Sequence, residues 1–131
     1  MTTPSGSDRY VVDSSGWVEF LGNGPKADAF ATYLEKQETL LLPTIVVYEV
    51  YKKMLREQDL ALAEKFLSIA FSFQAHEIVL DVSLAALAAK KSLAANLPMA
   101  DAIIYATAQA HQAELVTSDA HFSGLPGVTL I

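Results

Sequence analysis

The sequence predicts an α/β fold in which a mostly parallel, five-stranded sheet is covered by helices on both faces. Two observations support this prediction. Short apolar runs alternate with longer amphipathic segments along the chain, which is typical of a parallel sheet with crossover helices. Hydrophobic residues make up 52% of the 131 residues and charged residues 18%, which is enough for a real core and argues against disorder.

The expected elements follow one another in simple alternation. The strands are short apolar runs, expected at 10–13, 39–42, 77–82, 114–119 and 127–131. The helices have apolar residues at helical spacing and are expected at 14–21, 26–37, 43–58, 59–73, 83–96 and 98–112.

Four residues mark expected helix boundaries. Ser14 or Ser15 could cap the first helix, since their hydroxyls accept backbone hydrogen bonds. Pro43 suits the first turn of the helix that follows the second strand. Asn96 tolerates the left-handed conformation that ends a helix.

The length is that of one ordinary domain, which we expect at 10–131 after a flexible lead-in at 1–9. The beginning of the chain does not read as a signal peptide, and no apolar run approaches the ~20 residues of a membrane helix. There are no cysteines, so a disulfide framework and a thiolate metal site are excluded. These features fit a cytoplasmic protein.

The charge balance is acidic. Nine basic and 15 acidic residues give a net charge of −6, whereas a general nucleic-acid coat would be basic. A protein of this composition that binds nucleic acid needs a local basic patch, or a metal ion that offsets the acids.

Four carboxylates stand where an apolar residue would be the easy choice. Asp13 and Asp119 end strands, and Glu49 and Asp101 lie early in helices. In a parallel α/β sheet these positions share the carboxyl edge, where ligands bind. Four anions there would repel one another, so we expect at least one raised pKa in the absence of metal.

Clustered oxygen ligands of this kind suit a hard divalent cation. Mg²⁺ binds through carboxylates, keeps several waters and leaves room for phosphate. Such ions activate water and stabilise in-line displacement at phosphorus. The pattern therefore indicates phosphodiester chemistry.

Each acid also has a simpler structural explanation. Asp13 could cap the next helix, and Glu49 could pair with Lys53 four residues later. Asp101 could complement a helix dipole, and Asp119 could begin a turn. Four such coincidences on one edge are less economical than one shared site.

The chain resembles the PIN-domain ribonucleases, and within them the VapC-type toxins of toxin–antitoxin pairs. The resemblance runs over the segments "VVDSSGWVEFL", "PTIVVYEVYKKML" and "LPMADAIIYATAQAHQAELVTSDAHF". The last is the most specific, because an Asp opens an alanine-rich helix and the following strand ends in Thr-Ser-Asp. The resemblance implies a three-layer α/β/α sandwich and metal-dependent RNA cleavage.

Carried over by position, the resemblance implies that Asp13, Glu49, Asp101 and Asp119 form the catalytic metal site, with Mg²⁺ or Mn²⁺ as the cofactor. A small hydroxyl residue beside the last acid belongs to the same site and corresponds to Thr117 or Ser118. The turn before the helix of Asp101, where the family often has glycine, has Asn96 here.

Other polar residues are less specific. Arg56, Lys52 and Ser118 are candidates for substrate binding, although a solvated helix face explains the two cations equally well. The histidines show no metal-ligand spacing, and a surface or packing role is expected for His121.

The resulting hypothesis is a metal-dependent endoribonuclease that cleaves structured RNA, such as tRNA or rRNA, as the toxin of a VapBC-type pair. Its partners would be a VapB-like antitoxin and, since 52% hydrophobic content is high for so small a chain, a second copy of itself. The alternatives are a catalytically inactive PIN-like binding module and a non-toxin PIN nuclease of RNA processing. A receiver-type phosphotransferase would need an Asp-x-Asp pair where this chain has "DSSG".

Overall fold

The computed structural model describes residues 8–73 and 76–131, so most of the expected lead-in at 1–9 lies outside the described residues. Within them a parallel sheet forms with the strand order β3-β2-β1-β4-β5. The five strands are β1 (Tyr10–Val12), β2 (Leu40–Pro43), β3 (Glu77–Ile78), β4 (Glu114–Thr117) and β5 (Val128–Leu130). The predicted five-stranded sheet is confirmed, and all of its pairings are parallel.

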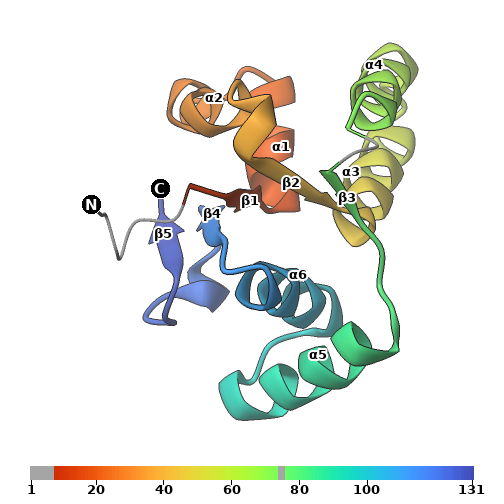
Figure 1. The fold of residues 1–131 in the computed structure, drawn as a ribbon. Helices are drawn as coiled ribbons and strands as arrows, with labels where there is room; N and C mark the ends of the chain where they lie inside the picture. Colours follow the sequence, from red (N-terminus) through yellow and green to blue (C-terminus); the bar gives the residue numbers. More distant parts are fainter. Residues whose placement is uncertain (1–7, 74–75) are drawn as a thin grey trace.

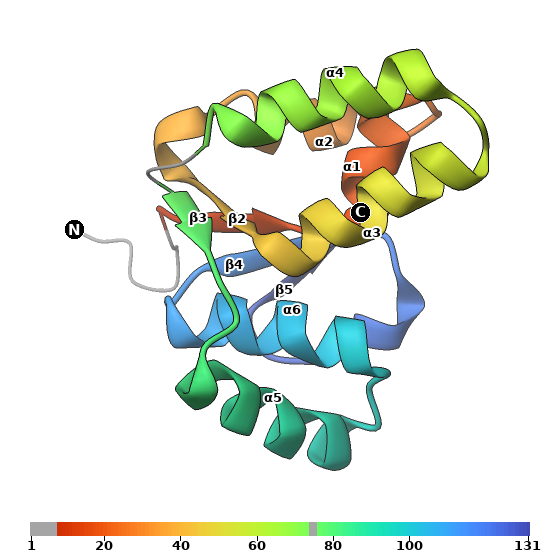
Figure 2. The same cartoon turned by 90° about the vertical axis from the view of Figure 1, so that its right-hand side faces the viewer.

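Helices cover both faces of this sheet. They are α1 (Ser14–Leu21), α2 (Ala27–Leu34), α3 (Thr44–Arg56), α4 (Leu60–Phe71), α5 (Val82–Ala95) and α6 (Met99–Ala110). The 3₁₀ turns η1 (Gln37–Thr39) and η3 (Ala120–Phe122) also lie within the described residues. Figures 1 and 2 show α5 and α6 below the strands and α1, α2 and α4 above them. The three-layer α/β/α architecture is therefore as predicted.

The structure settles or corrects three expected boundaries. Helix α1 is capped by Asp13 rather than by Ser14 or Ser15, because the Asp13 carboxylate reaches the N–H of Gly16. Pro43 ends β2 and lies just outside α3, where its fixed φ of −67° suits extended backbone. The expected strand 77–82 shrinks to Glu77–Ile78, because Asp81 leaves the sheet to cap α5.

The upper layer is held by aromatic packing around Trp17. Its ring meets Phe66 of α4 edge-on at 5.3 Å between centroids and meets Phe73 at 6.2 Å. All three side chains are at most 3% exposed. Edge-to-face pairs of this kind add about 0.5–1.5 kcal/mol beyond the area they bury. This packing fixes α1, and with it the residues at the end of β1.

Helix α6 is apolar because it lies between the sheet and α5. Seven successive residues, Ala102–Ala108, are buried. Its start is set by Asn96, which adopts the predicted left-handed conformation (φ 54°, ψ 47°) and turns the chain from α5. The Ser92 hydroxyl donates to Leu97 O at 2.8 Å and locks this turn. No helix in the described part of the chain is both long and apolar enough to cross a bilayer.

Strands β1 and β4 lie side by side at the centre, with Val12 level with Val116. The backbone N–H of Asp13 donates to Val116 O at 3.2 Å. The residues that follow these two strands therefore emerge at the same edge of the sheet.

Gly16 offers a test of how closely α1 approaches this edge. A Cβ at Gly16 would lie 2.5 Å from Val12 Cγ1 and 2.6 Å from Phe30 Cε1. Alanine normally stabilises a helix by about 1 kcal/mol relative to glycine. We expect Gly16→Ala to do the opposite and lower the free energy of unfolding by about 1–3 kcal/mol, since overpacking must shift the helix.

Urea unfolding followed by circular dichroism would measure this change. Gly22→Ala is the matched control, because its Cβ would meet only Val18 O, at 3.2 Å. The decrease in its free energy of unfolding should be clearly smaller. A Gly16→Ala variant as stable as the unmodified chain would contradict the packing described.

Candidate metal centre

Asp13 is a buried carboxylate at the carboxyl end of β1, with 2% of its surface exposed. Its Oδ1 accepts hydrogen bonds from Ser15 Oγ at 2.8 Å and Gly16 N at 3.1 Å, and its Oδ2 accepts one from Thr117 Oγ1 at 2.6 Å. Burial raises the pKa of Asp13 above its ordinary value of 3.8, although these three bonds favour the charged form. The carboxylate is thus held in one orientation.

Thr117 connects the first acid to the last. Its hydroxyl has a single proton, which it donates to Asp13, so its oxygen is left to accept the backbone N–H of Asp119 at 2.9 Å. Thr117 is fully buried, whereas Ser118 is partly exposed and its Oγ lies 3.4 Å from Ser15 Oγ. Of the two hydroxyl residues named from the sequence, Thr117 is the one that contacts Asp13.

Asp101, Asp119 and His121 meet beside this chain of bonds. Asp101 is in the first turn of α6, and Asp119 caps η3 by accepting the N–H of His121 at 2.9 Å. His121 Nδ1 lies 3.2 Å from Asp101 Oδ2 and 3.2 Å from Asp119 Oδ1. One ligand atom from each of the three residues falls within 4.8 Å of the others.

The electrostatics of Asp101 reflect this crowding. Its pKa rises from 3.8 to about 6, first because it is partly buried and next because the Asp119 charge is near. Glu49 raises it further, while His121 lowers it. A raised pKa was predicted from mutual repulsion alone. The prediction is confirmed, but burial contributes more than the neighbouring acids do.

Glu49 lies on α3 and faces the same edge. Its Oε1 accepts a hydrogen bond from Ser14 Oγ at 2.8 Å. The simpler pairing with Lys53 is not what the structure shows, because Lys53 Nζ lies 2.7 Å from Glu57 Oε2 instead. The influence of Glu49 on Asp101 places it near the other acids.

A cavity of about 440 Å³ opens next to these residues. Its walls come from α1, α3 and the chain after β4, and they consist of Ser14, Ser15, Val18, Glu19, Glu49, Lys53, Arg56 and Ser118. Two of the substrate-binding candidates, Arg56 and Ser118, are thus at its wall. Lys52 is not, since its Nζ lies over the ring of Tyr48 at 5.3 Å.

The donor set fits a divalent cation. Carboxylate oxygens are the preferred ligands of Mg²⁺ and Mn²⁺, and imidazole nitrogen is accepted by Mn²⁺. Asp101 and Asp119 bring such oxygens together, and Glu49 accepts the Ser14 hydroxyl on Oε1, which leaves its Oε2 for a cation among the described residues. Asp13 has three donors on its two oxygens, so only Oδ2 keeps room for a further partner.

His121 is the residue that sequence reasoning missed. It was expected to serve a surface or packing role, yet its ring nitrogen contacts both Asp101 and Asp119. The available signal was the Asp-x-His spacing directly after a strand, which places a carboxylate and an imidazole on one tight turn.

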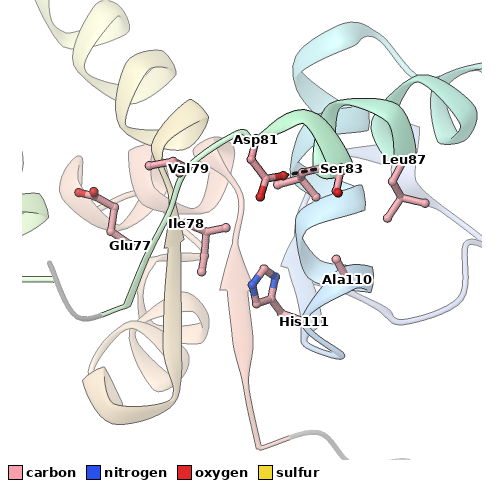
Figure 3. Close-up of a pocket in the computed structure, with 9 residues that line it drawn as sticks. Glu77, Ile78, Val79, Asp81, Ser83, Leu87, Ala110 and His111 are labelled. Atoms are coloured by element: carbon pink, nitrogen blue, oxygen red, sulfur yellow. Dashed lines mark hydrogen bonds between the residues drawn. The ribbon is translucent and has the colours of Figure 1, made fainter.

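A second cavity lies at the far end of α6 and shows no comparable cluster. Figure 3 shows Glu77, Asp81 and His111 at its wall. Asp81 accepts the N–H of Leu84 at 2.8 Å as the cap of α5, and His111 Nδ1 lies 3.0 Å from Thr107 O. His111 is ten residues beyond Asp101 along the chain, about 15 Å along the helix, so this cavity is separate from the acids.

Several solved structures share this fold. The chain is 21% identical to a toxin–antitoxin complex chain from Klebsiella pneumoniae, covering 92% of this chain and 95% of that one with a TM-score of 0.74. It is 20% identical to FitAcB from Neisseria gonorrhoeae, with 91% of this chain and 95% of that chain covered and a TM-score of 0.70. It is 18% identical to a chain of VapBC2 from Rickettsia felis, which was solved bound to a DNA fragment from its promoter; 93% of this chain and 96% of that chain are covered, with a TM-score of 0.66.

At these identities the structural likeness shows the fold alone. No curated protein matches the sequence. The PIN domain family, however, matches residues 10–128, which is nearly the whole of the 131-residue chain. This protein therefore belongs to the PIN domain family.

Proposed function

We propose that this protein is a metal-dependent endoribonuclease and the toxin of a VapBC-type toxin–antitoxin pair, acting in the cytoplasm. The observation that carries the proposal is the convergence of ligand atoms from Asp101, Asp119 and His121 within 4.8 Å, at the carboxyl edge of a PIN-domain sheet. PIN domains are typically metal-dependent nucleases. The neighbouring structures include toxin–antitoxin assemblies.

The four acids divide the work according to their contacts. Asp101 and Asp119 would hold Mg²⁺ or Mn²⁺ through their converging oxygens, and Glu49 would contribute its carboxylate from α3. Asp13 would contribute Oδ2 and, with Thr117, fixes the backbone that carries Asp119. When bound, a divalent cation supplies an activated water and offsets negative charge at the phosphate.

The substrate is a folded RNA that is recognised by its shape. Without the four proposed ligands, 11 acidic residues stand against nine basic ones, so the remaining surface has no strong positive field. Arg56 and Lys53 at the cavity wall are the cations placed to meet a phosphate beside Glu49. Ser118 lines the same cavity, whereas Lys52 contacts the ring of Tyr48 outside it. Local contacts of this kind suit a structured loop of tRNA or rRNA.

The proposed partners are an antitoxin and a second copy of the chain. Exposed apolar side chains support this part of the proposal, since Val82, Leu93 and Met99 are 75% exposed or more. Val82 and Leu93 lie at the two ends of α5 and Met99 begins α6, and apolar surface left exposed on neighbouring helices is often covered by another chain. The relatives solved as toxin–antitoxin complexes point the same way.

The Asp101→Asn variant distinguishes a metal-binding role of Asp101 from a purely structural one. If Asp101 only complemented the helix dipole, the variant would lose roughly 0.3–1 kcal/mol and keep its activity. We expect the reverse. Melting in EDTA at pH 7 should show equal or higher stability, because a partly buried, repelled charge is removed, while RNA cleavage with Mn²⁺ should fall at least a hundredfold. A destabilised but fully active variant would remove Asp101 from the site.

The pH dependence of stability should carry the same signature. The folded-state pKa of Asp101, about 6, is above the ordinary 3.8, so the folded protein binds the extra proton between these values. Metal-free protein should therefore lose stability as pH rises from about 4 to 6. Asp101→Asn should flatten this loss, leaving the smaller slope due to the raised pKa of Asp13. Melting curves in EDTA across this range would measure the difference, and parallel curves for the two proteins would contradict it.

Thr117→Val tests the bond between the first and last acids. The substitution keeps the shape but leaves Asp13 Oδ2 and the Asp119 N–H without their partner, which should cost about 1–3 kcal/mol. Metal affinity should also fall, because Asp119 is no longer held in place.

Thr107→Val is the matched control. Thr107 is equally buried, but its hydroxyl only donates to Ile103 O within α6 at 2.7 Å. Thr107→Val should lower the free energy of unfolding only slightly, as measured by urea unfolding, and should leave Mn²⁺ affinity unchanged in a calorimetric titration. Equal effects of the two substitutions would argue against a special role for Thr117.

A further inference from the structure

His121 occupies a place between two carboxylates that belong to different elements. Its Nδ1 lies 3.2 Å from Asp101 Oδ2 on α6 and 3.2 Å from Asp119 Oδ1 on the chain after β4. The position is fixed from both sides, because the His121 N–H donates to Asp119 Oδ1 and the next residue, Phe122, is fully buried. The side chain itself is 60% exposed, so core packing does not explain its orientation.

These separations match those between ligands of one octahedral ion. Ligand atoms about 2.1 Å from an ion and at right angles to each other lie about 3 Å apart. The two distances from Nδ1 are close to that value. A metal held by Asp101 Oδ2, Asp119 Oδ1 and His121 Nδ1 would replace the Nδ1 proton that the two carboxylates face in this structure, and its three ligand atoms already lie within 4.8 Å of one another.

We propose that His121 is a nitrogen ligand of the catalytic metal and that it makes the site prefer Mn²⁺ to Mg²⁺. The inference rests on the proposed function, since it assigns a further ligand to the same metal site. Both ions are oxygen-seeking, but Mg²⁺ keeps its waters and rarely accepts nitrogen, whereas Mn²⁺, as a transition ion, tolerates one imidazole among oxygen ligands. A nitrogen among carboxylate oxygens therefore gains affinity for Mn²⁺ and adds little for Mg²⁺.

The alternative is that His121 only offsets the charge of Asp101 and Asp119. The two roles predict different changes in metal affinity when the His121 side chain is removed. A ligand strengthens metal binding, so its removal lowers affinity, and more for Mn²⁺ than for Mg²⁺. A counter-charge contributes no bond to the metal, so its removal leaves the affinity for both ions unchanged or raises it, and to the same extent for each.

The experiment compares the unmodified chain with His121→Ala and His121→Asn at pH 8. Mn²⁺ binding is followed by the electron paramagnetic resonance signal of the free ion, and Mg²⁺ binding by its competition with Mn²⁺. Pulsed resonance of bound Mn²⁺ reports directly whether a ¹⁴N nucleus is coordinated. His111→Asn is the matched control, because the ring of His111 contacts the Thr107 carbonyl and lies at the other end of α6, away from the acids.

We expect nitrogen coupling in the unmodified chain and in His111→Asn, and its loss in both His121 variants. His121→Ala should lower Mn²⁺ affinity on the order of tenfold and Mg²⁺ affinity by clearly less. His121→Asn, which offers an oxygen in place of Nδ1, should bind both ions with a reduced preference for Mn²⁺. Melting in EDTA should be nearly unchanged, since the side chain is exposed.

Two results would overturn the inference while leaving the proposed function intact. One is Mn²⁺ bound to the unmodified chain without ¹⁴N coupling, and the other is a His121→Ala variant that binds both ions as tightly as the unmodified chain or more tightly. If the unmodified chain binds neither ion and Asp101→Asn changes nothing, the proposed metal site fails and this inference fails with it.

Discussion

The hydrogen bond from Thr117 to Asp13 links the carboxyl ends of β4 and β1, next to the candidate metal site. The 2.6 Å bond crosses from β4 to β1, and the same hydroxyl oxygen accepts the backbone N–H of Asp119. A buried carboxylate without such partners would be costly, since burial already raises the pKa of Asp13. The position of Asp119, and of the turn that carries His121, therefore depends on how Asp13 is satisfied.

The site keeps its charges together by unequal means. Asp13 is stabilised by three donors, and Glu49 by the Ser14 hydroxyl. Asp101 and Asp119 share His121 instead, and the pKa of Asp101 stays at about 6. Acids held by hydrogen bonds serve as a frame, whereas acids that remain crowded and poorly compensated are the ones that gain most from a cation. This division supports the proposal that Asp101 and Asp119 bind the metal most directly.

The remainder of the fold fixes where these groups stand. The Trp17 cluster holds α1 against the upper face of the sheet, and the buried α6 fills the lower face. The left-handed turn at Asn96 sets the start of α6, so that Asp101 falls in its first turn, level with the end of β4. An apolar helix with one carboxylate near its start is the sequence signature of this arrangement.

The sequence by itself determined the alternation of strands and helices, the parallel sheet and the four acids, because apolar periodicity and the carboxyl-edge rule depend on local pattern and topology alone. It also determined the left-handed cap at Asn96, a property of a single residue. The sequence left open whether Asp13, Ser14 or Ser15 caps α1. Only the tertiary structure decided that Thr117 rather than Ser118 contacts Asp13 and that His121 lies between Asp101 and Asp119. Both contacts join residues that are far apart in the sequence and lie on different elements. Such contacts are set by how the elements pack, which no local pattern contains.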